Sequence, residues 1–370
     1  MLGDLNWTPE FWVNLFALVP IASVLGITLR YHLKTRFKHT RYLSLMWVGG
    51  TFWCLGDALS QLFLSVPLHT VASYGLVVLA FAQIFLYDAI DRESVDPVKL
   101  SVNAVLFSIY VYSTFQPGKI YVDPNLPYGP GVTLTDDMYL AGAIGSILGG
   151  FIAIYYNLKV FFKAPRYLRV RAGLIILSTI IIASGLVGGY LTGANRAFPG
   201  VDNISMAIGA TLKAIVWVRT PALGFVLPFR VYRLAVVERD SGLPVYVKRW
   251  REELGESDEV DSRDAEVNDA LFENMLHAAS AVLKGAVRKG AVREVRLEQA
   301  VLIVFQFEDY PVDLVLVGNK FSTTLEHALA RFADAFVLNH SKFLESPERS
   351  MLTLDASDLV EQCFGFIPHQ

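Results

Sequence analysis

The chain has 370 residues, of which 53% are hydrophobic and 18% are charged, a balance too apolar for an ordinary soluble protein. Its formal net charge is -3, and it lacks the basic face that a nucleic-acid-binding protein needs, so no nucleic-acid partner is expected. The two cysteines, Cys54 and Cys363, form neither a CxxC motif nor a zinc pattern, and we expect both to be packing residues.

Apolar runs dominate residues 1–229. A helix needs about 20 residues to cross a hydrocarbon core of roughly 30 Å, and runs of that kind recur along this part of the chain. We therefore expect an all-α, seven-helix transmembrane domain in a lipid bilayer. The runs are Phe11–Leu29, Tyr42–Val66, His69–Ile90, Lys99–Gln116, Met138–Phe162, Gly173–Gly193 and Ile204–Leu227.

Lysine and arginine alternate between the connecting loops in a way that predicts orientation. Loops that carry them stay on the cytoplasmic side. The loops after the first, third and fifth runs are basic, whereas the loops between them carry at most one such residue. The N-terminus is therefore predicted to lie outside and the C-terminal domain in the cytoplasm of a multi-pass protein of the cell membrane. The basic residues are Arg30, Lys34, Arg36, Lys38 and Arg41, then Arg92 and Lys99, then Lys163, Arg166, Arg169 and Arg171.

The longest outer loop, residues 117–137, contains the sequence DPNLPYGPG. Proline, glycine and aspartate in such density favour turns, so we expect order from turns at most. The loop either holds a ligand or simply connects two spans, and connection is the simpler interpretation.

Polar residues inside the apolar runs are costly and therefore informative. Counted at about 1.5 Å per residue from the outer ends of their runs, Asp57 and Lys213 both lie roughly 13 Å deep. Gln61 is one turn from Asp57, and Gln83 lies near the depth of Arg219. Two interpretations stay open: a structural Asp57–Lys213 pair that holds two helices in register, or a polar cavity that binds a ligand, an ion or a proton.

From Arg230 onward the pattern changes to that of a soluble domain, residues 230–370. Residues 231–250 read as a hairpin around a turn, and residues 251–264 as a solvated acidic loop. The predicted order is β-β-α-β-β-β-α-α, an α+β fold on a five-stranded antiparallel sheet. The remaining elements are a helix at about Asp264–Lys289, strands Val292–Leu297, Val301–Phe307 and Val312–Gly318, a helix that begins near Ser322 with a Thr323/Glu326 capping box and ends by Pro347, and a helix at Ala356–Cys363.

This element order, with the opening RLAVVERDSGLPVYVKRW and the ending LVEQCFGFIP, resembles that of longin domains, in the broader longin and roadblock group. The resemblance covers about Arg230–Gln370. It implies a non-catalytic interaction module that binds small GTPases, their regulators, trafficking proteins or other longin-like domains, and it allows a homodimer. The long acidic insert departs from a minimal longin domain.

The first half resembles the N-terminal seven-helix sensor regions attached to prokaryotic histidine kinases, with the basic first loop and the connection RESVDPVKLS as the local similarities. The chain has no Gly-rich ATP-binding sequence, P-loop, HExxH, GxSxG or GGDEF motif. We therefore expect no enzyme, no catalytic residues, no cofactor and no bound metal.

Two functions follow from these expectations. The favoured one is a membrane receptor or anchor that senses a ligand or membrane state through the helices and recruits a cytoplasmic protein through the C-terminal domain. The alternative is a transporter or ion-translocating protein with a regulatory cytoplasmic tail. An inverted repeat with interrupted helices would favour transport, and the sequence displays neither.

Overall fold

The computed structural model describes residues 5–91, 94–192, 198, 200–227, 229–239, 244–250, 292–296, 300–307, 309–345 and 355–367. The chain divides into two compact units, Met1–Leu227 and Pro228–Gln370, within a few residues of the predicted boundary. The predicted acidic loop 251–264 and the predicted helix at Asp264–Lys289 lie outside the described residues.

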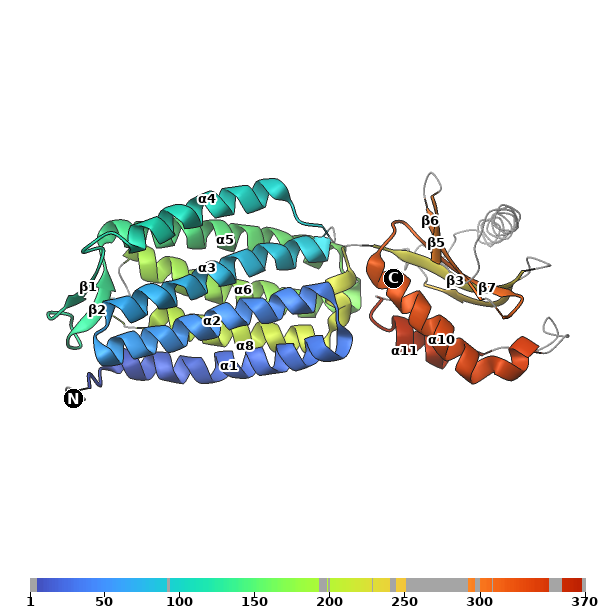
Figure 1. The fold of residues 1–370 in the computed structure, drawn as a ribbon, viewed down its shortest axis with the longest axis horizontal. Helices are drawn as coiled ribbons and strands as arrows, with labels where there is room; N and C mark the ends of the chain where they lie inside the picture. Colours follow the sequence, from blue (N-terminus) through green and yellow to red (C-terminus); the bar gives the residue numbers. More distant parts are fainter. Residues whose placement is uncertain are drawn as a thin grey trace. The chain divides into compact units, whose positions relative to one another are not determined.

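The first unit is a bundle of long helices that lie side by side (Figure 1). Five of them are long and apolar enough to cross a membrane: α1, α3, α5, the Arg166–Gly189 part of α6, and α8. The other two helices, α2 and α4, are not apolar enough to be counted with these five, so the seven-span topology stays a prediction. The helices are α1 (Pro9–Thr35), α2 (Lys38–Phe63), α3 (Val66–Asp91), α4 (Pro97–Thr114), α5 (Asp136–Lys163), α6 (Arg166–Thr192) and α8 (Val201–Arg219).

Local sequence signals set several helix ends. Thr8 caps α1 by accepting a hydrogen bond from the backbone N–H of Phe11, and proline follows at the first helical position. Asp96 caps α4 in the same manner through the N–H groups of Val98 and Lys99. At the other end of the unit, α8 stops at Arg219 because the residue before Pro221 is disfavoured in the helical region. The predicted run Ile204–Leu227 is therefore interrupted before Pro221 and continues as a short 3₁₀ helix.

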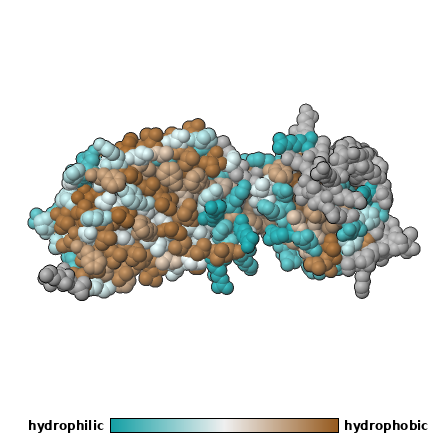
Figure 2. All heavy atoms as spheres, viewed as in Figure 1, coloured by the Kyte–Doolittle hydropathy of each residue, from teal (hydrophilic) through white to brown (hydrophobic). Residues whose placement is uncertain are grey.

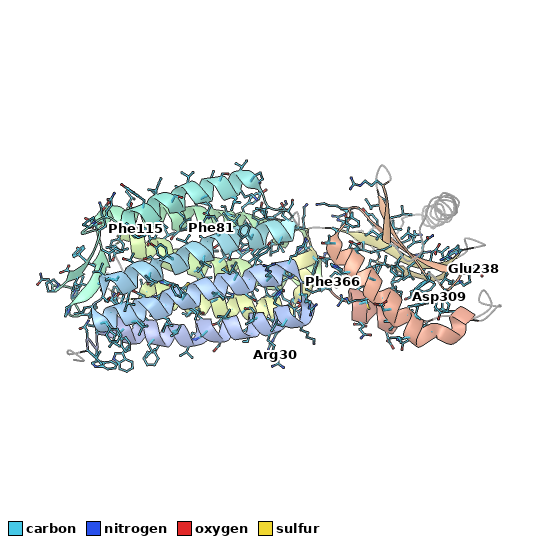
Figure 3. All side chains as sticks on the ribbon, in the orientation of Figure 1. Arg30, Phe81, Phe115, Glu238, Asp309 and Phe366 are labelled. Atoms are coloured by element: carbon cyan, nitrogen blue, oxygen red, sulfur yellow. The ribbon has the colours of Figure 1, made fainter. Side chains whose placement is uncertain are left out.

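Large apolar side chains cover the outside of the helical unit (Figure 2). Phe16, Phe162 and Val170 are 69%, 71% and 75% exposed. Arg30, near the end of α1, and Phe115, just after α4, both point outward (Figure 3). A monomeric soluble protein rarely presents a continuous apolar surface of this kind. The surface therefore suits lipid, as the apolar helices do.

A β-hairpin connects α4 to α5, which corrects the expectation of turns alone. Strands β1 (Ile120–Asp123) and β2 (Gly131–Leu134) pair antiparallel. Ile120, Val132 and Leu134 are buried together with Tyr110 of α4 and Met138 of α5. The turn-rich DPNLPYGPG sequence is the tip of this hairpin, and the burial of the short apolar strands on either side provides the stabilisation that turns lack.

The second unit contains a five-stranded antiparallel sheet in the spatial order β4-β3-β7-β6-β5. The predicted hairpin over 231–250 is confirmed by the pairing of β3 with β4. The central strand β7 is buried along its whole length, and its sequence VDLVLVG is apolar apart from Asp313. The strands are β3 (Val231–Glu238), β4 (Pro244–Arg249), β5 (Val292–Arg296), β6 (Val301–Gln306) and β7 (Val312–Gly318).

Two helices follow the sheet, α10 (Thr323–Glu345) and α11 (Ser357–Phe364). One face of α10 is apolar, and its residues Leu325, Leu329, Phe332 and Phe336 are fully buried. The predicted cap is one residue off. Ser322, not Thr323, accepts hydrogen bonds from the N–H groups of Thr324 and Leu325, because Thr323 already belongs to the helix. Pro347 lies outside the described residues.

Candidate functional site

The five predicted intramembrane polar residues do not form one site. Asp57 and Gln61 lie near the end of the bundle that carries the β1–β2 hairpin, whereas Lys213 and Gln83 line a cavity farther along the helices. Arg219 is the exposed last residue of α8. Of the two interpretations left open by the sequence, the structural Asp57–Lys213 pair is absent, because the described contacts of each residue are with other groups.

The physical reason is a shift of the helix ends. The runs were counted from Val66 and Ile204, but α2 ends at Phe63 and α8 begins at Val201. Asp57 is therefore only about 9 Å from its helix end, and Lys213 is about 18 Å from the corresponding end of α8. Both helix ends lie three residues earlier in the chain than the run boundaries. This places Asp57 nearer to its helix end and Lys213 farther from its own, so the two residues do not lie at equal depth.

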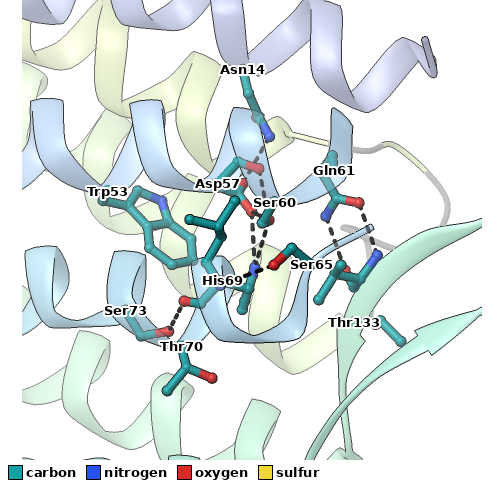
Figure 4. Close-up of polar contacts among 12 residues, drawn as sticks. Asn14, Trp53, Asp57, Ser60, Gln61, Ser65, His69, Thr70, Ser73 and Thr133 are labelled. Carbon is teal, nitrogen blue, oxygen red and sulfur yellow. Dashed lines mark hydrogen bonds and ion pairs between the residues drawn. The ribbon is translucent and has the colours of Figure 1, made fainter. Parts of the chain in front are cut away.

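Asp57 is the centre of a buried polar cluster, the Asp57 cluster, formed with Asn14, Trp53, His69 and Asn203. Figure 4 shows Asp57 with Asn14, Trp53 and His69. Asn14 Nδ2 donates to Oδ2 of Asp57 at 2.7 Å, and Nδ1 of His69 lies 3.1 Å from Oδ1 of Asp57. Asn203 Nδ2 donates to Oδ1 of Asn14 at 2.8 Å, and Trp53 Nε1 donates to Oδ1 of Asn203 at 2.9 Å. The cluster ties together α1, α2, α3 and α8.

A second feature lies beside the Asp57 cluster. A small cavity of about 50 Å³ is lined by Glu10, Asp57, His69 and Asp202 beneath the hairpin residue Tyr128. Nε2 of His69 is buried there without a hydrogen-bond partner. Among the described residues, no group of His, Cys, Asp or Glu side chains is arranged to hold a metal ion. Glu10 and Asp202 also lie in the first turns of α1 and α8, where negative charge is favoured by the helix dipole.

Gln61 is an anchor for the hairpin. Its Nε2 donates to the carbonyl oxygen of Val132 at 2.9 Å, and its Oε1 accepts from the N–H of Val132 at 2.9 Å. The side chain thereby pairs with β2 as a neighbouring strand would. Gln61 is fully buried, so its role in the structure is to hold β2 against α2.

Lys213 belongs to a different network in the middle of the bundle. The side chain is 4% exposed, and its Nζ donates to the hydroxyl of Tyr87 at 3.5 Å. That hydroxyl also accepts from Asn157 Nδ2 at 3.2 Å, and Asn157 Nδ2 donates to Oγ1 of Thr179 at 2.7 Å. No carboxylate lies within ion-pair distance of Lys213 among the described residues. A buried ammonium with one long hydrogen bond is therefore poorly compensated.

The cavity that Lys213 lines has a volume of about 240 Å³ and lies between α2, α3, α4, α5, α6 and α8. Its walls are almost entirely apolar or glycine. Gln83, which also lines it, has its amide nitrogen committed to the carbonyl oxygen of Gly149 at 2.7 Å. Most of the remaining walls come from Leu76, Leu79, Leu106, Phe107, Ile109, Tyr110, Ile144, Gly145, Gly149, Ile182 and Leu186.

The Lys213 network continues toward the other end of the bundle. The ring of Tyr87 stacks on that of Tyr156 with centroids 5.5 Å apart, and the hydroxyl of Tyr156 accepts a hydrogen bond from Lys99. Lys99 also pairs with the buried carboxylate of Asp88 at 2.5 Å. Nearby, Lys159 pairs with Asp91 at 2.5 Å. Lys99 also lies 3.6 Å from Asp96, so each of these two lysines has a carboxylate partner, unlike Lys213.

Several of these residues were absent from the sequence-based site. Asn14 and Asn157 each interrupt an apolar run, and an inventory of every amide within a run finds both. Asn203 stands one residue before the run Ile204–Leu227, so its place in α8 follows only from the observed helix start at Val201. His69 and Asp88 are less conspicuous because they stand at the ends of a run, where charge costs little. Their importance depends on the helix positions, which the run boundaries did not give.

The chain matches no known protein-family model and no curated protein sequence.

Proposed function

We propose that this chain is a membrane receptor or anchor. Its helical unit senses a ligand or a state of the membrane, and its C-terminal unit recruits a cytoplasmic protein. The observation that carries the proposal is the cavity of about 240 Å³ in a unit with five candidate membrane spans, in a chain whose second unit is built on an antiparallel sheet. A cavity that is mostly apolar and has few polar groups is typical of a ligand site.

Helix α8 would couple the ligand cavity to the C-terminal unit. A ligand shifts the C-terminal unit only if it binds two conformations unequally, and Lys213 places α8 in the wall of the cavity. After α8 the chain forms the short 3₁₀ helix η1 (Pro221–Phe225). The ring of Phe225 contacts Phe37 and His39 at the start of α2, with centroids 4.9 and 5.0 Å away. A movement of α8 against α2 would therefore reach the segment that leads to the second unit.

The partner class rests on the resemblance to longin domains. The five-stranded antiparallel sheet and the two following helices support a domain of that layer type, and family membership is part of the proposal. The expected partner is a small GTPase or another longin- or roadblock-like protein, or a second copy of this chain. Sheet edges and helix faces are the surfaces that such associations use.

Affinity capture with the full chain in native membranes tests the proposal. Gly145 lines the cavity, and a Cβ at this position would meet only Phe107 Cζ, at 3.7 Å. A leucine side chain in Gly145→Leu can therefore extend into the cavity and fill it. Phe225→Ala removes the contact between η1 and α2. We expect the wild type to capture a GTPase or longin-like protein, and both variants to change the amount captured. Phe115→Ala, on the exposed surface, is the control and should match the wild type. If capture is equal for all four proteins, the receptor function is wrong.

The proposed orientation has its own test. Asn125, in the hairpin tip, and Glu361, on α11, are both exposed. A cysteine at either position can be labelled in intact cells above a low background, because Cys54 and Cys363 are buried. An impermeant thiol reagent should label Asn125→Cys and not Glu361→Cys. The reverse pattern would invert the topology and remove cytoplasmic recruitment.

Transport is the alternative, and the buried ionisable groups Asp57, His69 and Lys213 favour it, because such groups mark ion and proton pathways. Proteoliposomes that hold the full chain and a pH-sensitive dye would distinguish the two functions. Proton flux that is lost in Lys213→Met would support transport over reception.

A further inference from the structure

Lys213 and the cavity around it suggest what the ligand is. The cavity is apolar apart from a few groups. Of these, Gln83 and Thr179 donate hydrogen bonds within the bundle, whereas the hydroxyl of Tyr110 and Nε1 of Trp47 are buried without a hydrogen-bond partner. Lys213 supplies the one cationic group among the described lining residues. An ammonium buried in such surroundings is normally paired with an anion. We propose that the cavity binds a single-chain amphiphile with a carboxylate head, such as a long-chain fatty acid, and that the carboxylate pairs with Nζ of Lys213.

The position of the cavity mouth indicates that the ligand enters from the bilayer. Ile109 on α4 and Ile144 on α5 line the cavity and are also 55% and 47% exposed. The mouth therefore lies on the apolar outer surface of the helical unit, between α4 and α5. An amphiphile dissolved in lipid reaches this mouth without crossing water, and its alkyl chain would bury against leucine, isoleucine and phenylalanine walls.

Size and depth argue for one acyl chain and a small head. The volume of about 240 Å³ lies below the range of roughly 300–1,000 Å³ common for pockets that hold drug-sized ligands, so two acyl chains do not fit. Lys213 is six residues before the end of α8 at Arg219, which is about 9 Å along the helix. A phospholipid phosphate stays at the interface, beyond the reach of a lysine at that depth. The head of a fatty acid is smaller than a phospholipid headgroup with its glycerol, and pairing with Nζ of Lys213 offsets the desolvation of the carboxylate.

Direct binding to the full chain in neutral phosphatidylcholine nanodiscs tests this inference, with tritiated palmitate as the probe. Hexadecanol is the competitor that keeps the chain and lacks the charge, and dipalmitoyl phosphatidic acid represents a lipid headgroup. We expect saturable palmitate binding, with unlabelled palmitate competing at least about tenfold better than hexadecanol, since a charge-assisted contact contributes roughly 1.5–3 kcal/mol. Equal competition by hexadecanol, or stronger competition by phosphatidic acid, overturns the assignment.

Two variants and a matched control locate the probe. Lys213→Met should weaken palmitate binding by at least about tenfold and leave hexadecanol binding as it is. Lys159→Met removes the same charge from α5, where Lys159 pairs with Asp91 and does not line the cavity, and should bind palmitate like the wild type. Gly145→Leu should lose both ligands. Wild-type palmitate binding by Lys213→Met or by Gly145→Leu overturns the inference, and if Gly145→Leu does not fold, the two lysine variants decide alone.

This inference deepens the proposed function, and the two can fail separately. Palmitate binding that depends on Lys213 without any change in partner capture would leave the ligand assignment standing and contradict the receptor function. Partner capture that responds to hexadecanol as strongly as to palmitate would leave the receptor function standing and contradict the carboxylate.

Discussion

Two of the buried ionisable residues in the helical unit are in opposite circumstances. Asp57 and Lys213 are each 4% exposed. Asp57 accepts a hydrogen bond from Asn14 at 2.7 Å and lies 3.1 Å from His69, and its neighbours are bonded to one another. Lys213 has one described hydrogen bond, of 3.5 Å, to Tyr87, and it faces an apolar cavity of about 240 Å³.

The difference separates structural charges from ligand-binding ones. A buried charge that the fold surrounds with hydrogen bonds contributes to holding the helices in place, and removing it leaves its partners unsatisfied. Lys213, beside empty apolar space, has only one long hydrogen bond to Tyr87 and the ring of the same residue, 6.0 Å from its Nζ, to compensate its charge. A molecule bound in the cavity would supply the rest.

The largest effect is expected at the Asp57 cluster. Asp57→Ala removes the carboxylate and leaves Asn14 and His69 buried without their partner, at a cost of about 3–5 kcal/mol. Lys213→Met breaks no ion pair and should change stability far less. Thermal unfolding of both variants in detergent, followed by monodispersity on size exclusion, measures the difference. Equal destabilisation by the two substitutions would abolish the contrast between the sites.

A satisfied charge in the other unit provides an independent test. Arg239 Nη2 donates to Oδ1 of Asp313 at 2.8 Å and to the carbonyl oxygen of Phe307 at 2.8 Å, and Asp313 is 5% exposed. Arg239→Met leaves that carboxylate without its cation and should cost about 2 kcal/mol. Limited proteolysis of the C-terminal unit in the full chain follows the loss. Arg239→Lys keeps the positive charge and should be less sensitive to protease than Arg239→Met. If the two variants are equally sensitive, the loss of stability comes from side-chain packing and not from the charge.

Some elements of this structure could be predicted from the sequence, and others could not. The long apolar runs predicted the helices, and alternating apolar residues predicted β3 and β4, because periodicity records which face is buried. The hairpin β1–β2 was missed because four-residue strands such as Ile120–Asp123 are too short to show a period. The partners of Asp57 were missed because contacts across a bundle depend on helix ends to within one turn, and capping by residues such as Gly200 is weak in sequence.

Gln61 tests whether the hairpin depends on a single side chain. Gln61→Leu leaves the N–H and C=O groups of Val132 without their partner and should cost about 1 kcal/mol or slightly more, mostly local to the hairpin. Hydrogen exchange of the backbone amides in residues 120–134 should accelerate. Gln83→Leu is the matched control, since Gln83 bonds to Gly149 and does not touch the hairpin. Unchanged exchange in Gln61→Leu would show that burial of Ile120 and Leu134 is sufficient.

The smallest effect is a coupling that should be absent. Asp57 and Lys213 have no described contact and no shared hydrogen-bond partner, and sites without shared partners add to within about 0.5 kcal/mol. The double variant Asp57→Asn/Lys213→Met should therefore be destabilised by the sum of the two single changes. Thermal unfolding of all four proteins in the same detergent gives the coupling energy. A double variant that is markedly more stable than the sum would mean that the two charges meet in solution. It would restore the inter-helix pair that their equal depth in the sequence suggests, and the separation of a structural charge from a ligand-binding charge would fall with it.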